Sequence, residues 1–168
     1  VEVQEFVLPL CEVNAQGGDD IATVQDETYV LEPGDYGDVD FAARNDVTLT
    51  GGNYTFKSLR FGPDSRVEIQ APTEIQVENH LRFNRGVEVA LNGPTPEEVK
   101  YFVNGGMSID PQSKAGDHTV IYGTICGGSE SVIKIGQNSY MEGGLYGKEI
   151  RLGAGVEFVA SPASLPQP

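Results

Sequence analysis

The sequence predicts an all-β fold, a single three-faced parallel β-solenoid (β-helix) with about 20–22 residues in each coil. Three observations lead to it: helical periodicity is nearly absent, short apolar-x-apolar triplets recur, and the triplets return at a regular interval. Triplets such as Val47-Thr48-Leu49 and Leu59-Arg60-Phe61 each indicate a short strand with one buried face. At 168 residues the chain suits one such domain.

Residues that form turns separate the triplets. Gly51-Gly52-Asn53, Gly62-Pro63-Asp64 and Asn84-Arg85-Gly86 are rich in side chains that favour turns or tolerate a positive φ. We therefore expect the strands to be separated by corners, with three strands in each repeat.

The spacing of the apolar residues predicts which strands stack. Two inward columns are expected, because each set returns to the same side after one coil. The first column, at intervals of 20, is Val47, Val67 and Val87. The second column, separated by 20 and then 22, is Phe41, Phe61 and Phe83. A meandering antiparallel sandwich has no reason to keep such a period, whereas a coil would stack its strands about 4.8 Å apart.

The same template returns near the end and is interrupted twice. Residues 150–158 repeat the triplet, the glycine corner and the second triplet. Residues 95–99 predict one helical turn on a corner, with Thr95 as N-cap, Pro96 at the first helical position and Glu98 closing a capping box. The polar stretch 110–118 is expected to be a longer loop.

Charge divides the chain into a strongly acidic start and a balanced remainder. Residues 1–43 contain eleven acids, and no Lys or Arg occurs before Arg44. We expect residues 1–30 to cap or pack on the coil, 31–160 to form the solenoid, and 161–168 to be a Pro-rich tail or linker. The acids of 17–27 could hold Ca²⁺, but their spacing does not match a calcium loop, so a solvated acidic loop is favoured. No other cofactor or metal is expected.

Overall composition disfavours two classes of partner. The 11 Lys and Arg against 25 Asp and Glu give a net charge of −14, which argues against general nucleic-acid binding. The longest apolar run is far shorter than the roughly 20 residues that a membrane span needs, so no span is expected in this chain.

The two cysteines allow two interpretations. Cys11 and Cys126 could form a disulfide, which would suit an exported protein, or could be two small buried side chains. They are not clustered with His80 or His118, so a zinc site has little support, and each histidine is expected in a surface loop.

The outward residues of the triplets form two expected columns of opposite charge. The first is Asp40, Arg60, Arg82, Ser108, Lys134 and Arg151. The second is Thr48, Glu68, Glu88 and Glu157. Because stacked like charges repel, the two columns either pair around their shared corner or bind a partner along the face. Pairing is the favoured interpretation, and the basic residues Arg60, Arg82, Lys134 and Arg151 are the candidate binding site.

Several segments resemble the β-solenoid domain of exported bacterial surface proteins. The segments are 31–37 (LEPGDYG), 49–56 (LTGGNYTF), 95–98 (TPEE), 121–123 (IYG) and 143–153 (GGLYGKEIRLG). In that group the domain often follows a type IV pilin-like N-terminal helix, as in minor-pilin-like proteins. The resemblance spans about residues 31–158 and implies an extracellular or cell-surface location in a bacterium. It carries over no catalytic residues.

These observations rank three functions. The first is a non-enzymatic structural or adhesion module of the cell surface or pilus, whose partners are other surface or pilus components. The second is a binder of an anionic polymer, polysaccharide or DNA, along the basic column. The third is a carbohydrate-active enzyme. It ranks last because Glu68 and Glu88 are expected to stack at one strand spacing, closer than the roughly 5–5.5 Å between the carboxyl groups of a retaining glycosidase.

The two open ends of the solenoid affect whether copies of the chain associate. An open solenoid leaves unpaired strand edges that can recruit another copy. The acids of the first coil and the prolines of the tail work against end-to-end growth, so a monomer or a side-by-side oligomer is expected.

Overall fold

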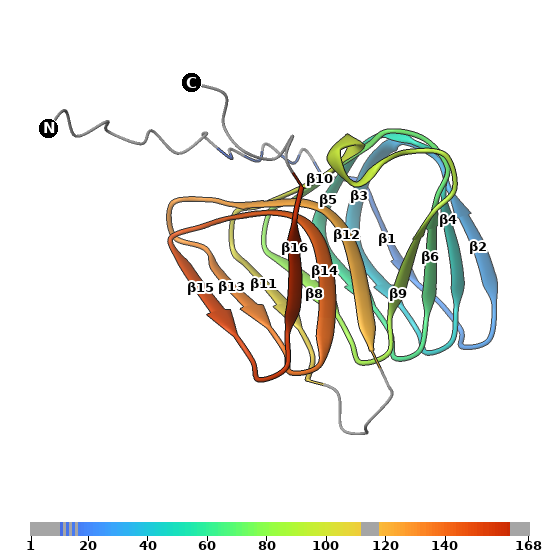
Figure 1. Cartoon of the computed structure of the whole chain (residues 1–168). Coiled ribbons are helices and arrows are strands. Elements are labelled where there is room, and N and C mark those ends of the chain that lie inside the picture. The colour runs from blue at the N-terminus through green and yellow to red at the C-terminus, as the bar shows by residue number, and fades with distance from the viewer. Residues whose placement is uncertain (1–10, 12, 14, 16, 112–117, 162–168) are drawn as a thin grey trace, which may run out of the picture.

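A computed structural model describes residues 11, 13, 15, 17–111 and 118–161 of the chain. Parallel strands wind into a β-solenoid of about seven turns, with almost no helix, as the triplet pattern predicts (Figure 1). Every strand pairing in the described residues is parallel, and each coil contributes short strands to three faces.

The strands divide among three faces, numbered here for reference. Face 1 contains β2 (Thr28–Leu31), β4 (Asp46–Leu49), β6 (Arg66–Ile69), β9 (Glu88–Leu91), the first parts of β12 (Thr119–Gly127) and β14 (Ser139–Tyr146), and β16 (Glu157–Ala160). Face 2 contains the second parts of β3 (Gly34–Phe41) and β5 (Gly52–Phe61), then β8 (His80–Phe83), β11 (Gly106–Ile109), β13 (Val132–Ile135) and β15 (Glu149–Leu152). Face 3 contains the first parts of β3 and β5, then β7 (Thr73–Val77), β10 (Val99–Val103) and the second parts of β12 and β14.

The core is a set of inward columns that run along the solenoid axis. The expected column of Phe41, Phe61 and Phe83 is confirmed, since each pairs with the next across the face 2 ladder. Their ring centroids lie 5.4 and 5.3 Å apart in stacked arrangements, and all three side chains are buried. Strand alternation points these rings inward, and the parallel register brings identical side chains into contact.

The expected column of Val47, Val67 and Val87 is only partly right. Val47 pairs with Val67, but Val67 pairs with Val89, so Val87 is displaced from the ladder although it is buried. The physical reason is that two corners of this coil each hold one additional residue. Tyr54 pairs with Ile75 after 21 residues, and Leu59 pairs with Leu81 after 22 residues.

The same shift breaks the expected acidic column. Glu68 pairs with Ala90, whereas Glu88 pairs with Arg66, so Glu68 and Glu88 do not share a column. A two-residue slip preserves which side chains face inward, because the period of a strand is two. The core pattern of face 1 therefore survives, but the outward neighbours of Glu68 and Glu88 change.

The corner between face 2 and face 1 stacks residues with positive φ. Arg44, Asp64 and Gly86 have φ values of 57°, 58° and 71° at equivalent places in successive coils. Backbone hydrogen bonds join the corners, from Arg44 N–H to Pro63 O at 2.8 Å and from Asp64 N–H to Arg85 O at 2.9 Å. A Cβ at Gly86 would lie 2.2 Å from Asp64 Oδ1, so both the conformation and the space favour glycine there.

Insertions lengthen the middle coils without breaking the ladders. The helical turn expected at 95–99 is confirmed as the 3₁₀ turn η1 (Pro96–Glu98), where the backbone N–H of Thr95 donates to the Glu98 carboxylate at 2.9 Å. The expected polar loop follows β11, and residues 112–117 of that loop lie outside the described residues.

The described part of the acidic segment belongs to the ladders. β1 (Asp19–Ala22) pairs with β3, and β2 pairs with β4, so these strands form the first edge of the solenoid. Most of the expected tail, residues 162–168, and residues 1–10 of the N-terminal segment lie outside the described residues.

Candidate functional site

The candidate binding column on face 2 is a continuous row of outward side chains. The ladders pair each member with the next, in the order Asp40, Arg60, Arg82, Ser108, Lys134 and Arg151. We call this row the face 2 column. The prediction from sequence spacing that these residues share a column is confirmed, because each one directly follows the structurally equivalent inward residue of its own coil.

Most of the positive charge in the face 2 column is paired within the chain. Arg60 Nε lies 3.1 Å from Asp40 Oδ1, and Arg82 Nη2 lies 2.9 Å from Asp110 Oδ2. The hydrogen bonds that Arg82 donates to the Asp110 carboxylate raise the pKa of Arg82. These pairs are solvent-exposed, so each contributes little to stability but offsets the charge that a polyanion would meet.

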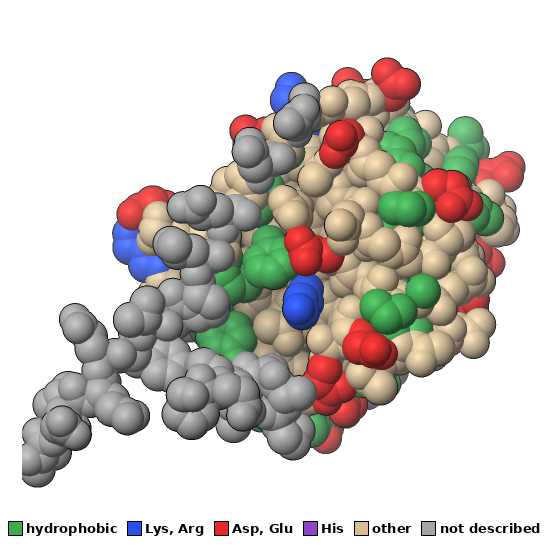
Figure 2. Space-filling view, turned by 90° about the horizontal axis from the view of Figure 1, so that it is seen from above, with side chains coloured by type: hydrophobic (Ala, Val, Ile, Leu, Met, Phe, Trp, Pro, Cys, Tyr) green, Lys and Arg blue, Asp and Glu red, His purple; other side chains and the backbone are tan. Residues whose placement is uncertain are grey.

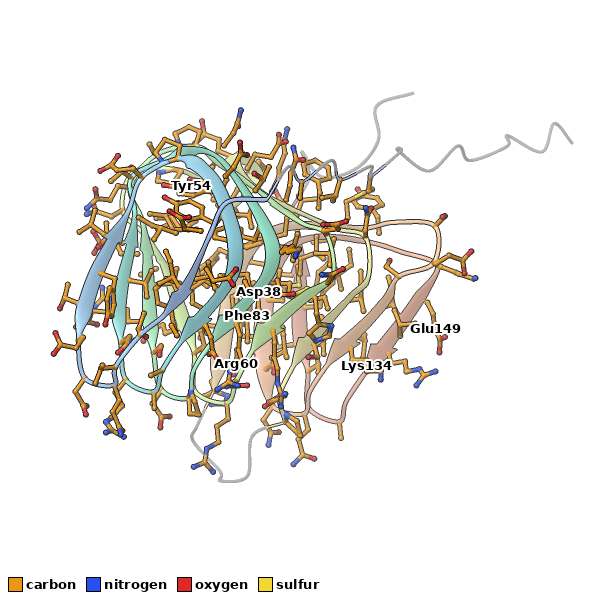
Figure 3. The ribbon with its side chains drawn as sticks, turned by 180° about the vertical axis from the view of Figure 1, so that it is seen from behind. Asp38, Tyr54, Arg60, Phe83, Lys134 and Glu149 are labelled. Atoms are coloured by element: carbon orange, nitrogen blue, oxygen red, sulfur yellow. A yellow bond between two sulfur atoms is a disulfide. The ribbon has the colours of Figure 1, made fainter. Side chains whose placement is uncertain are left out.

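The C-terminal end of the face 2 column differs from the rest. Arg151 Nε bonds Glu149 Oε1 at 2.5 Å on the same strand, and this bond lowers the pKa of Glu149. Lys134 forms no ion pair with the described residues, although its charge adds to the lowering of the Glu149 pKa. Figure 3 shows Lys134 and Glu149 at this end of the molecule.

A shallow depression of about 430 Å³ lies at the other end of face 2. Its charged lining groups are Asp38, Asp40, Arg60 and Arg82, so two carboxylates oppose two guanidinium groups. The depression is therefore close to electrically balanced. It can bind a ligand through polar contacts, but it does not form the positive groove that a polyanion requires.

His80 also lines this depression, which corrects its expected place in a loop. It is the first residue of β8, and its Nε2 lies 3.1 Å from Ser108 Oγ. Burial, followed by the charges of Arg82 and Lys134, lowers the pKa of His80 below its usual 6.5. The lowered pKa favours the neutral imidazole. His80 lies two residues before the outward Arg82, so the two-residue period of a strand places both side chains on the same side. The prediction from the triplets did not use this spacing.

Face 1 carries a second, smaller depression of about 210 Å³. Asp46, Arg66 and Glu68 supply its charged lining groups. The side-chain amides of Gln70 and Asn92 donate to Glu68 at 3.0 and 3.1 Å and lower its pKa. Because these amides bind the ionised form, Glu68 is suited to remain a carboxylate rather than to act as a general acid.

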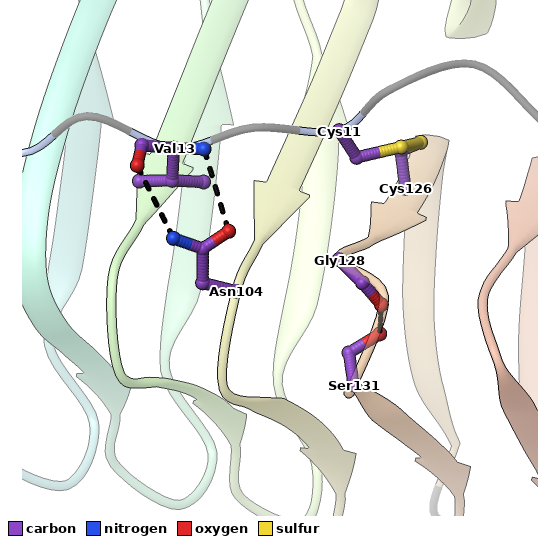
Figure 4. Close-up of a disulfide and its surroundings, with 6 residues drawn as sticks. All are labelled: Cys11, Val13, Asn104, Cys126, Gly128 and Ser131. Atoms are coloured by element: carbon purple, nitrogen blue, oxygen red, sulfur yellow. Dashed lines mark hydrogen bonds between the residues drawn. A yellow bond between two sulfur atoms is a disulfide. The ribbon is translucent and has the colours of Figure 1, made fainter.

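Face 3 holds the start of the described chain. A disulfide joins Cys11 to Cys126 of β12, with the Cα atoms 5.7 Å apart (Figure 4). Two residues further on, Val13 exchanges two backbone-to-amide hydrogen bonds with Asn104, of 3.4 and 3.2 Å. Cys11 and Val13 are thus tied to face 3 by a disulfide and by two hydrogen bonds.

The described acids of the suggested calcium segment contact the protein itself. Asp20 Oδ1 accepts the Asp38 N–H at 2.8 Å, and Asp26 bonds Arg44 at 2.6 Å. The hydrogen bond from Arg44 lowers the pKa of Asp26. Among the residues that the structure describes, no group of three or more His, Cys, Asp or Glu side chains is placed to hold a metal ion.

Acidic side chains outnumber basic ones on the side of the molecule seen from above in Figure 2. This distribution agrees with the net charge of −14. No helix in the described part of the chain is long and apolar enough to cross a membrane.

Comparison with known proteins supports the fold alone. No protein-family model matches the chain, and no curated protein matches its sequence. Among solved structures, the chain is similar to an ice-binding protein with antifreeze activity (LeIBP) from an Arctic yeast, with a TM-score of 0.51 and 14% identity. The match covers 88% of this chain but only 57% of that protein. The neighbour is a β-helix protein, so the likeness shows the β-helix fold.

Proposed function

We propose that this chain is a non-catalytic module of the bacterial cell surface, a rigid β-solenoid that presents face 2 to other surface or pilus components. The face 2 column carries this proposal. Six consecutive strands hold one row of outward polar groups in register, and the inward residues of the first five of these strands are buried in the core. Such a face suits contact with an extended partner surface rather than with a small substrate.

The disulfide supports a location outside the reducing cytoplasm. Cys11 and Cys126 are 115 residues apart in sequence, and such bonds persist in oxidising compartments such as the cell exterior. The location is an inference from this chemistry and from the resemblance to exported surface proteins.

The two other candidate functions have weaker support. A polyanion binder would use Arg60, Arg82, Lys134 and Arg151, but three of these four are paired with carboxylates. A carbohydrate-active enzyme would use a carboxylic acid and a carboxylate as a pair, but Glu68 and Glu88 lie in different columns, and the hydrogen bonds from Gln70 and Asn92 lower the pKa of Glu68, which opposes a role as general acid. The ice-binding activity of the structural neighbour stays with that protein, since 14% identity relates only the folds.

The test has two parts, location and binding. An antibody against the chain should label intact cells of the source bacterium, and external protease should remove the signal. Purified chain should then bind an isolated cell-surface fraction. An Arg82→Glu/Lys134→Glu variant should bind about tenfold more weakly, because both changes reverse the charge of the face 2 column.

A matched control separates the column from general charge. Arg66→Glu reverses one exposed charge on face 1 and should leave binding unchanged. A chain found only inside cells would overturn the proposed location. Equal losses for the face 1 and face 2 variants would overturn the assignment to face 2. Salt-sensitive retention of the wild-type chain on heparin, lost in the face 2 variant, would favour the polyanion reading instead.

A further inference from the structure

The last coil of the solenoid exposes residues that belong to the core columns. Ile150 and Leu152 of β15 follow Ile133 and Ile135 in the face 2 ladder, yet they are 39% and 55% exposed. On face 1, Phe158 of β16 follows Met141 and is 39% exposed. Within the described chain, β15 pairs only with β13 and β16 only with β14. The end therefore offers both apolar side chains and free strand edges.

The opposite end is better covered and more acidic. The inward Leu31 of β2 is 6% exposed, compared with 55% for Leu152. The first coil carries Asp19, Asp20 and Asp26 on or beside its edge strands. A second copy meeting this end with its own first coil would place like charges together.

The charges of β15 select the geometry of a partner. Glu149 and Arg151 flank Ile150 on the outward side of the strand. A two-fold axis through Ile150 would set Glu149 of one copy opposite Arg151 of the other, and Arg151 opposite Glu149. Directly opposed residues of antiparallel strands lie about 4.5–5.5 Å apart, within reach of an ion pair. The edge is thus complementary to itself.

We propose that the C-terminal ends of two copies join tail to tail, through antiparallel pairing of β15 with β15. The contact is isologous, so it closes as a dimer and does not grow into a filament. It pairs free backbone groups and covers Ile150 and Leu152. It also exchanges the Glu149–Arg151 ion pair within each strand for two such pairs across the axis. This proposal differs from the expectation of a monomer or side-by-side oligomer, which rested on the acids of the first coil and the prolines of the tail as features that oppose end-to-end growth.

Head-to-tail stacking fits the charges less well. The first strand edge on face 2 belongs to β1, which carries Asp19 and Asp20. Continuing the parallel ladder from β15 to β1 would bring Glu149 towards these two acids. The tail-to-tail contact instead matches each charge with its opposite.

A charge-swap experiment tests the dimer with the full oxidised chain. Sedimentation equilibrium of the wild type should show a monomer–dimer equilibrium. Glu149→Arg and Arg151→Glu should each weaken it by at least about tenfold, because each places like charges across the axis. Mixing these two variants should form a heterodimer, and the double variant Glu149→Arg/Arg151→Glu should dimerise as the wild type does.

The controls distinguish this contact from folding and from the surface role. Glu149 and Arg151 are exposed, so at concentrations where the chain is monomeric all variants should keep the wild-type circular dichroism and melting temperature. Arg82→Glu, on the same face but away from the end, should leave dimerisation unchanged. A wild type that stays monomeric at every attainable concentration would overturn the proposal. Filaments, or a dimer unaffected by either single reversal, would do the same, and neither result bears on binding by face 2.

Discussion

Interior coils and the last coil place similar side chains in the same columns but bury them very differently. Ile135 is 2% exposed, and Leu152, which follows it in the ladder, is 55% exposed. On face 1, Met141 is fully buried and Phe158 is 39% exposed. Strand alternation decides that all four point inward. Burial is decided by whether another coil stacks on top, so an inward residue contributes fully only between two neighbours.

This difference has an energetic consequence. Burying apolar surface contributes about 25 cal/mol per Å², so the free energy of unfolding depends mainly on the interior columns. The residues of the last coil contribute less to stability and keep unsatisfied apolar surface. That surface is available for association, and the following experiments compare it with the interior.

The largest expected effect comes from a charge in an interior column. Val67→Asp should unfold the domain, because Val67 is buried between Val47 and Val89 and no cation is available to pair with the new carboxylate. Leu152→Asp should remain folded, because that position already meets solvent. Circular dichroism of both variants decides this. A well-folded Val67→Asp variant with unchanged melting would contradict the ladder register.

Removal of an aromatic ring should lower the free energy of unfolding more in an interior coil than in the last coil. Phe61→Ala should lower the free energy of unfolding by about 3–5 kcal/mol, because it leaves a cavity between Phe41 and Phe83. Phe158→Ala should cost about 1 kcal/mol or less, because that ring is only partly covered. Denaturant titration at concentrations where the chain is monomeric gives both values. Equal losses would show that the last coil is as well packed as the interior.

Loss of the disulfide should lower the free energy of unfolding by an intermediate amount and should leave the last coil unaffected. The double variant Cys11→Ser/Cys126→Ser should be less stable by about 2–4 kcal/mol, because the bond closes a long loop and restricts the unfolded chain. Cys126 lies in β12, which does not pair with β15, so hydrogen exchange at β15 should not change. Faster exchange at β15 in this variant would mean that the N-terminal segment also holds the last coil.

The smallest effect concerns His80, an outward residue of an interior coil. Its pKa is lowered in the folded state, so the unfolded chain binds more protons just below pH 6.5. With respect to His80, the free energy of unfolding should therefore be highest above about pH 6.5. It should decrease as the pH falls through that value towards the pKa of the folded state. NMR titration of the His80 ring should give an apparent pKa below 6.5. Arg82→Gln should raise that pKa, because it removes a nearby positive charge; an unchanged value would contradict the assigned environment.

Local pattern was sufficient to predict the fold and part of the candidate site. The triplets, the glycine corners and the capping box at Thr95 are short-range features, and the structure contains each of them. The Phe41, Phe61 and Phe83 column and the face 2 column were also predictable, because an outward residue keeps its place relative to its inward neighbour. The exported location, the surface partners and the pilus association implied by the resemblance stay predictions.

Only the tertiary structure decided the register at the corners and the balance of charge. Corner lengths vary by single residues at little energetic cost, so spacing alone could not place Val89 rather than Val87 beside Val67. The partner of Arg82 is Asp110, which lies 28 residues away in sequence. Leu152 is exposed because, in the part of the chain that the structure describes, β15 has a neighbouring strand on one side only. The sequence by itself determined which way each side chain points, because the two-residue period of a strand is local. What each side chain meets depends on how the coils stack, which is a property of the whole solenoid.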